Sequence, residues 1–327
     1  MHLSKFTLFT ALSLTAAAAS ACDLCAIYNI NDLHGGAPGW RLGIAEQFTH
    51  FKTLHLDGRE VGNAAGQHLD SSVTQILLGH NFNDRLSLQL SVPLIYRDFR
   101  RTEEAGVRDD HTEGLGDIAL TANAVLVRHD AERFAFMWTA TAGVKLPTGS
   151  TRRLKEETLE GHTHADADHE ETAPAELPES GIHGHDLTLG SGSWDAIVGT
   201  SIYARYERAF FTGSVQYSIR TEGDYHYRFA DDLSWNAGPG FYLALREKYT
   251  VALQAVCSGE HKPRDTFRGA RSEDTGITAV YLGPELSVTY KDRMSAEIGV
   301  DLPVHLDNTA LQIVPDLRLR AAFSVRF

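Results

Sequence analysis

Histidine and carboxylate side chains gather in one segment of this chain, residues 148–191. Its five histidines are His162, His164, His169, His183 and His185, and ten acids with no Lys or Arg occupy residues 156–186. Neutral imidazole binds Zn and Cu, and a His-x-His spacing puts two ligands within reach of one ion. The segment therefore predicts weak binding of Zn or Cu and no other cofactor. The alternative is a solvated loop that its acids keep extended and soluble.

Two cysteines offer a second chemistry near the N-terminus. Cys22 and Cys25 stand in the sequence Cys22-Asp23-Leu24-Cys25. In an oxidising compartment such a pair forms a disulfide, and a lipid anchor on Cys22 or a metal or redox role stay open. Haem attachment of the c type is excluded, because Ala26 stands where that motif needs a histidine.

Catalytic and nucleotide-binding motifs are missing from the sequence. It contains no Gly-x-Ser-x-Gly elbow, no phosphate-binding loop and no dinucleotide fingerprint. The net charge of −13 comes largely from the acidic segment and disfavours a nucleic-acid partner. We therefore expect a protein that is not an enzyme.

The first 21 residues have the features of a secretory signal peptide. A basic start over residues 1–5 precedes an apolar stretch, and Ala19-Ser20-Ala21 forms a small-x-small cleavage site. No later run approaches the ~18 apolar residues of a membrane helix. An exported chain of this kind spans a membrane only as a closed barrel, which leaves no backbone group unpaired in lipid.

Alternation of apolar and polar residues is the dominant pattern, and the C-terminal segment has it most clearly. Leu317, Leu319, Ala321, Phe323, Val325 and Phe327 alternate with a face that carries Arg318, Arg320 and Arg326. Successive side chains of a strand point to opposite faces, so the segment has one apolar and one basic face. The same pattern predicts twelve strands, over residues 40–55, 71–81, 86–96, 118–126, 134–146, 194–204, 211–219, 233–246, 249–258, 277–290, 294–304 and 313–327.

The connections between these strands alternate in length. Short ones cover residues 82–85, 129–132, 207–210, 247–248 and 291–293, and long ones cover 56–70, 100–113, 148–191, 222–232, 259–276 and 305–312. An even strand number with this asymmetry is typical of a transmembrane antiparallel β-barrel of the bacterial outer membrane, with short periplasmic turns and long extracellular loops. The sequence thus predicts an all-β chain. Residues 22–39 are expected to form a periplasmic or plug segment, and residues 40–327 a single barrel of about twelve strands in contact with lipid.

Three glycine-containing motifs and the last residue carry resemblances to known proteins. The motifs are Gly114-Leu115-Gly116-Asp117, Lys145-Leu146-Pro147-Thr148-Gly149 and Leu189-Gly190-Ser191-Gly192-Ser193-Trp194-Asp195. They resemble the outer-membrane transporter-like family associated with meta-pathway phenol degradation, which is similar to channels for hydrophobic compounds. Their positions at loop-to-strand junctions favour a structural role. A closing strand that ends on Phe327 resembles the signal that the barrel-assembly machinery reads.

The polar faces of the strands define the expected lumen. The charged residues expected to line it are Lys145, Arg205, Arg220, Glu285, Glu297, Asp301, Arg318, Arg320 and Arg326. They either form ion pairs that fill the barrel or form a charged constriction that selects permeants. Passive transport of small molecules, including hydrophobic or aromatic compounds, is the predicted function. Metal capture by the histidine-rich loop and a non-conducting structural barrel are the alternatives.

Overall fold

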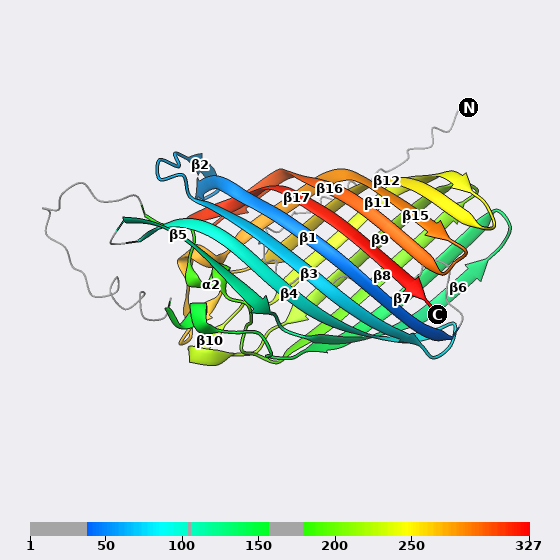
Figure 1. Cartoon of the computed structure of the whole chain (residues 1–327), viewed down its shortest axis with the longest axis horizontal. Helices are drawn as coiled ribbons and strands as arrows, with labels where there is room; N and C mark the ends of the chain where they lie inside the picture. Colours follow the sequence, from blue (N-terminus) through cyan, green and yellow to red (C-terminus); the bar gives the residue numbers. More distant parts are fainter. Residues whose placement is uncertain (1–37, 104–105, 157–178) are drawn as a thin grey trace, which may run out of the picture.

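Twelve antiparallel strands close into one barrel in a computed structural model that describes residues 38–103, 106–156 and 179–327 (Figure 1). β17 pairs with β1 along their whole length, so the sheet has no open edge among its twelve spanning strands. The barrel strands are β1 (Gly39–Leu56), β3 (His68–Asn81), β4 (Leu86–Glu103), β6 (Ala119–Asp130), β7 (Phe134–Lys145), β8 (Asp195–Tyr206), β9 (Ala209–Ile219), β11 (Asp232–Leu245), β12 (Tyr249–Lys262), β15 (Ile277–Tyr290), β16 (Met294–Asn308) and β17 (Leu311–Arg326). The predicted fold class and strand number are confirmed.

The two ends of the barrel differ, as the loop lengths predict. Short turns lie at the right in Figure 1, beside the C-terminus, and long connections lie at the left. We call these the short-turn end and the long-loop end. The long connections carry strands of their own, namely β2 (Arg59–Val61), β5 (Gly106–Leu115), β10 (Tyr227–Arg228), β13 (Thr266–Phe267) and β14 (Ala270–Arg271), and the short helices η1 (Asp224–His226) and η2 (Glu273–Thr275).

One predicted long loop is wrong. Residues 305–312 are not a loop, because β16 continues to Asn308 and β17 begins at Leu311. Only a two-residue turn separates these strands, with Ala310 at φ 54° and its carbonyl accepting from the Asn308 side chain. The alternation of apolar and polar residues ends after Val304. The two strands nevertheless stay paired beyond the apolar belt, at the long-loop end, where outward polar side chains are tolerated. Similarly, β4 extends to Glu103 and forms a hairpin with β5, inside the predicted loop 100–113.

The outer wall is hydrophobic around the barrel. On β16 the outward side chains include Ile298, Leu302 and Val304, each more than half exposed. Glu46 is an exception on the outward face of β1, as the interrupted alternation there indicates. The Ser72 and Thr74 hydroxyls of β3 both donate to its carboxylate, so this acid is hydrogen-bonded within the wall.

Aromatic side chains mark both ends of the outer wall. At the short-turn end Trp40 and Phe327 exchange two backbone hydrogen bonds of 3.0 Å, and both side chains are largely exposed. At the long-loop end Trp194, just before β8, is 60% exposed. Amphipathic aromatic rings favour the interface between hydrocarbon and water, so these positions bound an apolar belt.

A folded segment fills the long-loop end of the barrel. Residues 179–194, which contain the helix α2 (Gly184–Leu187), run through the lumen before they reach the outer wall at Trp194, and they bury Ile182 and Leu187 completely. These two side chains pack against inward residues of four strands. The cluster comprises Phe51, Leu54, Leu69, Phe99, Ile182, Leu187 and Ile313. We call residues 179–194 the plug. The described residues contain no helix long and apolar enough to cross a membrane.

Several predicted features lie outside the described residues. These are the signal peptide, the segment 22–37 with Cys22 and Cys25, and the histidines His162, His164 and His169. Cys257, which the structure does describe, is a free thiol.

Candidate functional site

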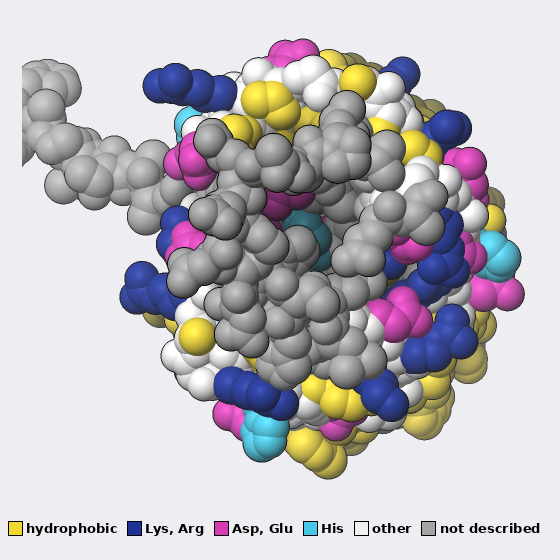
Figure 2. All heavy atoms as spheres, turned by 90° about the vertical axis from the view of Figure 1, so that its left-hand side faces the viewer, with side chains coloured by type: hydrophobic (Ala, Val, Ile, Leu, Met, Phe, Trp, Pro, Cys, Tyr) yellow, Lys and Arg dark blue, Asp and Glu magenta, His cyan; other side chains and the backbone are white. Residues whose placement is uncertain are grey.

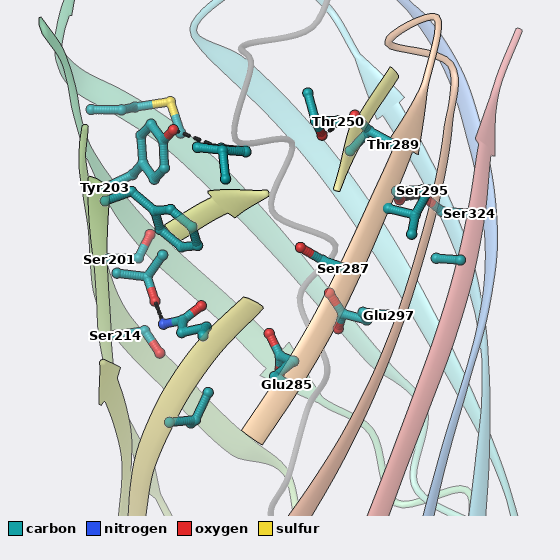
Figure 3. A pocket seen from close by; sticks show the side chains of 18 of the residues that line it. Ser201, Tyr203, Ser214, Thr250, Glu285, Ser287, Thr289, Ser295, Glu297 and Ser324 are labelled. Carbon is teal, nitrogen blue, oxygen red and sulfur yellow. Dashed lines mark hydrogen bonds between the residues drawn. The ribbon is translucent and has the colours of Figure 1, made fainter. Parts of the chain in front are cut away.

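The lumen at the short-turn end contains a cavity of about 220 Å³. Its lining comes from β7, β8, β9, β11, β12, β15, β16 and β17, with Arg41 of β1. Figure 3 shows that its two walls differ in chemistry: Glu285, Glu297 and Ser287 project from one side, and Tyr203 and Ser201 from the other.

The charged wall is organised by one arginine. Arg320 on β17 donates from Nε and Nη2 to the two oxygens of Asp301, at 2.8 and 3.0 Å, and from Nη1 to Glu285, at 2.9 Å. Such a bidentate pair fixes the position of the guanidinium. Glu297 also lines the cavity, and none of its contacts within the described residues is an ion pair. Arg326 lines the cavity nearer the short-turn end.

The opposite wall is aromatic. The Tyr203 and Tyr242 hydroxyls are hydrogen-bonded at 2.8 Å, and the Phe210 ring lies 4.9 Å from that of Tyr242. Met137 packs against this group. All four residues line the cavity and belong to β7, β8, β9 and β11. None of the four was among the predicted lumen residues. Alternation along the predicted strands places Met137, Tyr203 and Tyr242 on the inward face, whereas Phe210 fell in the predicted turn 207–210.

A second charged group lies further along the lumen. Arg318 pairs with Glu260 at 2.8 Å and lies over the ring of Tyr281, with 4.2 Å between guanidinium carbon and ring centroid. The Tyr281 hydroxyl donates to the same carboxylate at 2.9 Å. Arg318 and Tyr281 are buried, so this predicted lumen residue holds the wall together rather than facing open space.

Four further ion pairs form a buried network next to the plug. Lys145 Nζ lies 2.8 Å from Asp195 and 3.0 Å from Asp117, and Arg220 lies 2.8 Å from Asp195 and 2.6 Å from Asp232. All five side chains are at most 5% exposed. The sequence placed Lys145 and Arg220 in the lumen but did not identify their three carboxylate partners.

The three glycine-containing motifs meet at this network. Asp117 of the first motif accepts hydrogen bonds from the backbone of Gly149 in the second and of Ser191 in the third, both at 2.9 Å. A Cβ on Gly149 would lie 2.5 Å from the Leu189 carbonyl oxygen, and one on Gly190 would lie 2.6 Å from Gly149 backbone atoms. Only glycine permits this approach. The motif residues therefore fasten the plug to the barrel wall.

The rim at the long-loop end carries charges of both signs, as Figure 2 shows. Arg153 Nη2 donates to Asp110 of β5 at 2.8 Å. That hydrogen bond lowers the pKa of the Asp110 carboxyl to about 2. Arg205, at the other end of the barrel, donates to the Glu207 carbonyl at 3.0 Å and does not line the cavity.

Two of the predicted metal ligands lie together in the plug. Ligand atoms of His183, His185 and Asp186 are all within 4.8 Å of one another. Asp274 of η2 joins them, with its Oδ2 at 3.3 Å from His183 Nδ1. Burial alone would raise the pKa of Asp274, but the interactions with His185 and His183 lower it below the usual aspartate value.

The closed barrel has an apolar outer belt, aromatic borders and a polar lumen. Because the sheet closes on itself, the backbone N–H and C=O groups of its strands are hydrogen-bonded to neighbouring strands, as a chain in lipid requires. The fold is similar to a solved outer-membrane channel from Pseudomonas putida F1, at 14% identity over 92% of this chain and 100% of that chain, with a TM-score of 0.60. The chain is an outer-membrane β-barrel. It lies in the bacterial outer membrane.

Other solved structures are less similar. The beta domain of the Bordetella autotransporter BrkA matches at 10% identity over 89% of this chain and 100% of that chain, with a TM-score of 0.44. The P. putida toluene transporter TodX matches at 9% identity over 88% of this chain and 90% of that chain, with a TM-score of 0.36. No family model and no curated protein matches the sequence.

Proposed function

We propose that this barrel is a channel for passive movement of small molecules across the outer membrane, and that its permeants are hydrophobic or aromatic compounds. The observation that carries the proposal is the lumenal cavity with an aromatic wall facing a charged one. Rings of Tyr203, Phe210 and Tyr242 offer apolar contact, while Glu285 and Arg320 offer polar groups. A pocket of this composition suits a small ring that bears a polar substituent. The resemblance to the phenol-degradation family favours the same class of permeant.

The fold favours a channel over catalysis. The barrel of about twelve strands is wider than one that side chains alone would fill, and narrower than an open porin. The similar P. putida F1 protein is itself a channel. Partners of the proposed channel are outer-membrane lipid, the permeant and the barrel-assembly machinery.

A flux comparison tests the proposal. The protein, purified from outer membranes in detergent, is reconstituted into liposomes, and swelling is followed in a small phenol and in a sugar of similar size. We expect faster swelling with the phenol. Phe210→Ala should slow phenol entry at least about twofold, because the ring's contact area is lost. Phe211→Ala is the matched control, since Phe211 is the next residue and lies on the outward, exposed face.

Equal effects of the two phenylalanine substitutions would argue against the aromatic wall as the path. Barrels that remain folded by heat-modified mobility in gels but admit neither solute would favour the structural-barrel alternative.

Substituting Arg320 is expected to change ion selectivity. Arg320→Gln removes the cation that balances Asp301 and Glu285, so the cavity becomes more negative. In planar bilayers the ratio of cation to anion permeability should rise roughly threefold or more, because fixed charges in a narrow pore exclude ions of like sign. Arg205→Gln, at the exposed periplasmic turn, is the control and should leave the ratio unchanged. An unchanged reversal potential in Arg320→Gln would place the ion path elsewhere.

A further inference from the structure

The plug carries a group of metal-ligating side chains that the proposed channel function does not use. His183 immediately precedes α2, and His185 and Asp186 belong to it. Asp274 comes from η2, in the connection between β12 and β15. Two imidazoles and two carboxylates are a donor set that suits a divalent transition metal, and the two carboxylates balance its charge.

The separations between these atoms match a small coordination sphere. Asp274 Oδ2 lies 3.3 Å from His183 Nδ1, and Asp186 Oδ1 lies 3.3 Å from His185 Nε2. Asp186 Oδ2 lies 3.9 Å from His183 Nδ1. Zinc bonds to N and O of 2.0–2.2 Å in a tetrahedron place neighbouring ligand atoms roughly 3.3–3.6 Å apart. The ligand atoms of His183, His185 and Asp186 already lie within 4.8 Å of one another, and Asp274 contacts this group through His183. A movement of the Asp274 side chain toward His185 would bring the four groups onto one ion.

His183 supplies an independent observation. Its Nδ1 atom is buried and makes no hydrogen bond with any of the described residues. The carboxylates of Asp186 and Asp274 nevertheless lie within 3.9 and 3.3 Å of it. A buried polar atom without a hydrogen bond is costly, and such an atom commonly binds an ion or water. His185 is held beside it, with a side chain only 3% exposed, and the two rings stack at 5.5 Å.

The surroundings leave the carboxylates available. Asp186 uses Oδ2 to accept from the His183 backbone at 2.9 Å, which leaves Oδ1 directed to His185. The nearest lysine, Lys262, is paired with Asp265 at 2.7 Å. We propose that His183, His185, Asp186 and Asp274 form a zinc-class site that joins the plug to the η2 connection of the barrel wall.

This site differs from metal capture by the histidines at positions 162–169, because it requires Asp274, which lies far from them in the sequence. The test is isothermal titration of the detergent-purified, full-length barrel with Zn²⁺, and with Co²⁺ to read coordination from its visible absorption. We expect one site of highest affinity. Asp274→Asn should weaken it at least about tenfold, and His185→Asn more, because each removes a ligand or its charge.

The matched control replaces His162, His164 and His169 together by asparagine. It removes more imidazoles than any single variant, yet should leave the highest-affinity site and its tetrahedral cobalt spectrum intact. Heat-modified mobility in gels confirms that each variant is a folded barrel.

Loss of binding in the control together with unchanged binding in Asp274→Asn would overturn the site. Absence of zinc binding by the folded wild-type barrel would also overturn it. Because binding is read without any flux measurement, failure of this site and failure of the channel proposal are separate results.

Discussion

Ile182→Asp combined with Leu187→Asp is expected to open the lumen at the long-loop end. Both side chains are fully buried against Phe51, Leu69 and Phe99 and their neighbours. Burying two carboxylates there without partners costs several kcal/mol each, so the plug should leave its position. Single-channel conductance in planar bilayers should rise about threefold or more, since a barrel of this size is blocked mainly by its inserted segment.

Three of the hydrogen bonds that oppose this displacement lie close to the two substituted residues. Ile313 donates its backbone N–H to the Gly181 carbonyl at 2.8 Å, and Arg97 Nη1 donates to the carbonyls of Asp186 and Thr188 at 2.7 and 2.6 Å. Each contributes on the order of 1–3 kcal/mol, so the cost of burying two carboxylates is comparable to the contribution of these three bonds together. The double variant is therefore preferred to either single one.

Glu179→Gln is the control for the plug variant. It changes a charge in the same segment at an exposed side chain, and the backbone carbonyl of Glu179 still accepts from Gln67. Its conductance should equal that of the wild type. A folded double variant with wild-type conductance would mean that permeants do not pass the plug position, and would favour an exit through the barrel wall.

The sequence predicted the wall of this barrel better than its contents. β15 coincides with the predicted strand 277–290, because alternation along Ile277–Tyr290 is regular and turn residues bound it. The short turn 82–85 also coincides with the connection between β3 and β4. Both features are local, and periodicity reports local structure. The turn at Thr309-Ala310 was missed because β16 and β17 continue beyond the apolar belt, where alternation no longer signals a strand.

The sequence of the plug shows no regular alternation of apolar and polar residues, so its position in the lumen could not be predicted. Ile182 and Leu187 lie in an acidic segment that composition assigns to solvent, and their burial depends on Leu54 and Ile313, which are distant in sequence. The same limit applies to Asp274 beside His183. Parity predicted that Glu285 and Arg320 face inward, but their pairing follows from strand register, which the sequence leaves open.

The three glycine-containing motifs show how sequence and structure connect in this chain. They were assigned a structural role at strand junctions, and the network of Asp117, Lys145 and Asp195 explains that role. The motifs supply both the close backbone contacts and the charges, so plug position and ion pairing are specified together.

Replacing one acid of this network is expected to have the largest effect on stability. Asp195 has no exposed side-chain surface and accepts from Lys145, Arg220 and Ser193. Asp195→Asn removes the negative charge but keeps the shape of the side chain. The buried cations Lys145 and Arg220 then lose the carboxylate that they share. Breaking a buried pair from one side costs about 3–5 kcal/mol, and we expect a loss in that range. The measurement is urea unfolding of the barrel in lipid vesicles, followed by tryptophan fluorescence.

Asp130→Asn is the matched control, because Asp130 pairs with Arg128 at 2.7 Å with 59% of its side chain exposed. An exposed pair contributes about 0–1 kcal/mol, so this variant should unfold close to the wild type. The double variant Lys145→Gln with Asp195→Asn removes one charge of each sign, and its loss should be smaller than the sum of the two single losses. Additive losses, or equal losses for Asp195→Asn and Asp130→Asn, would mean that the network is solvated and that the plug is held by its apolar contacts alone.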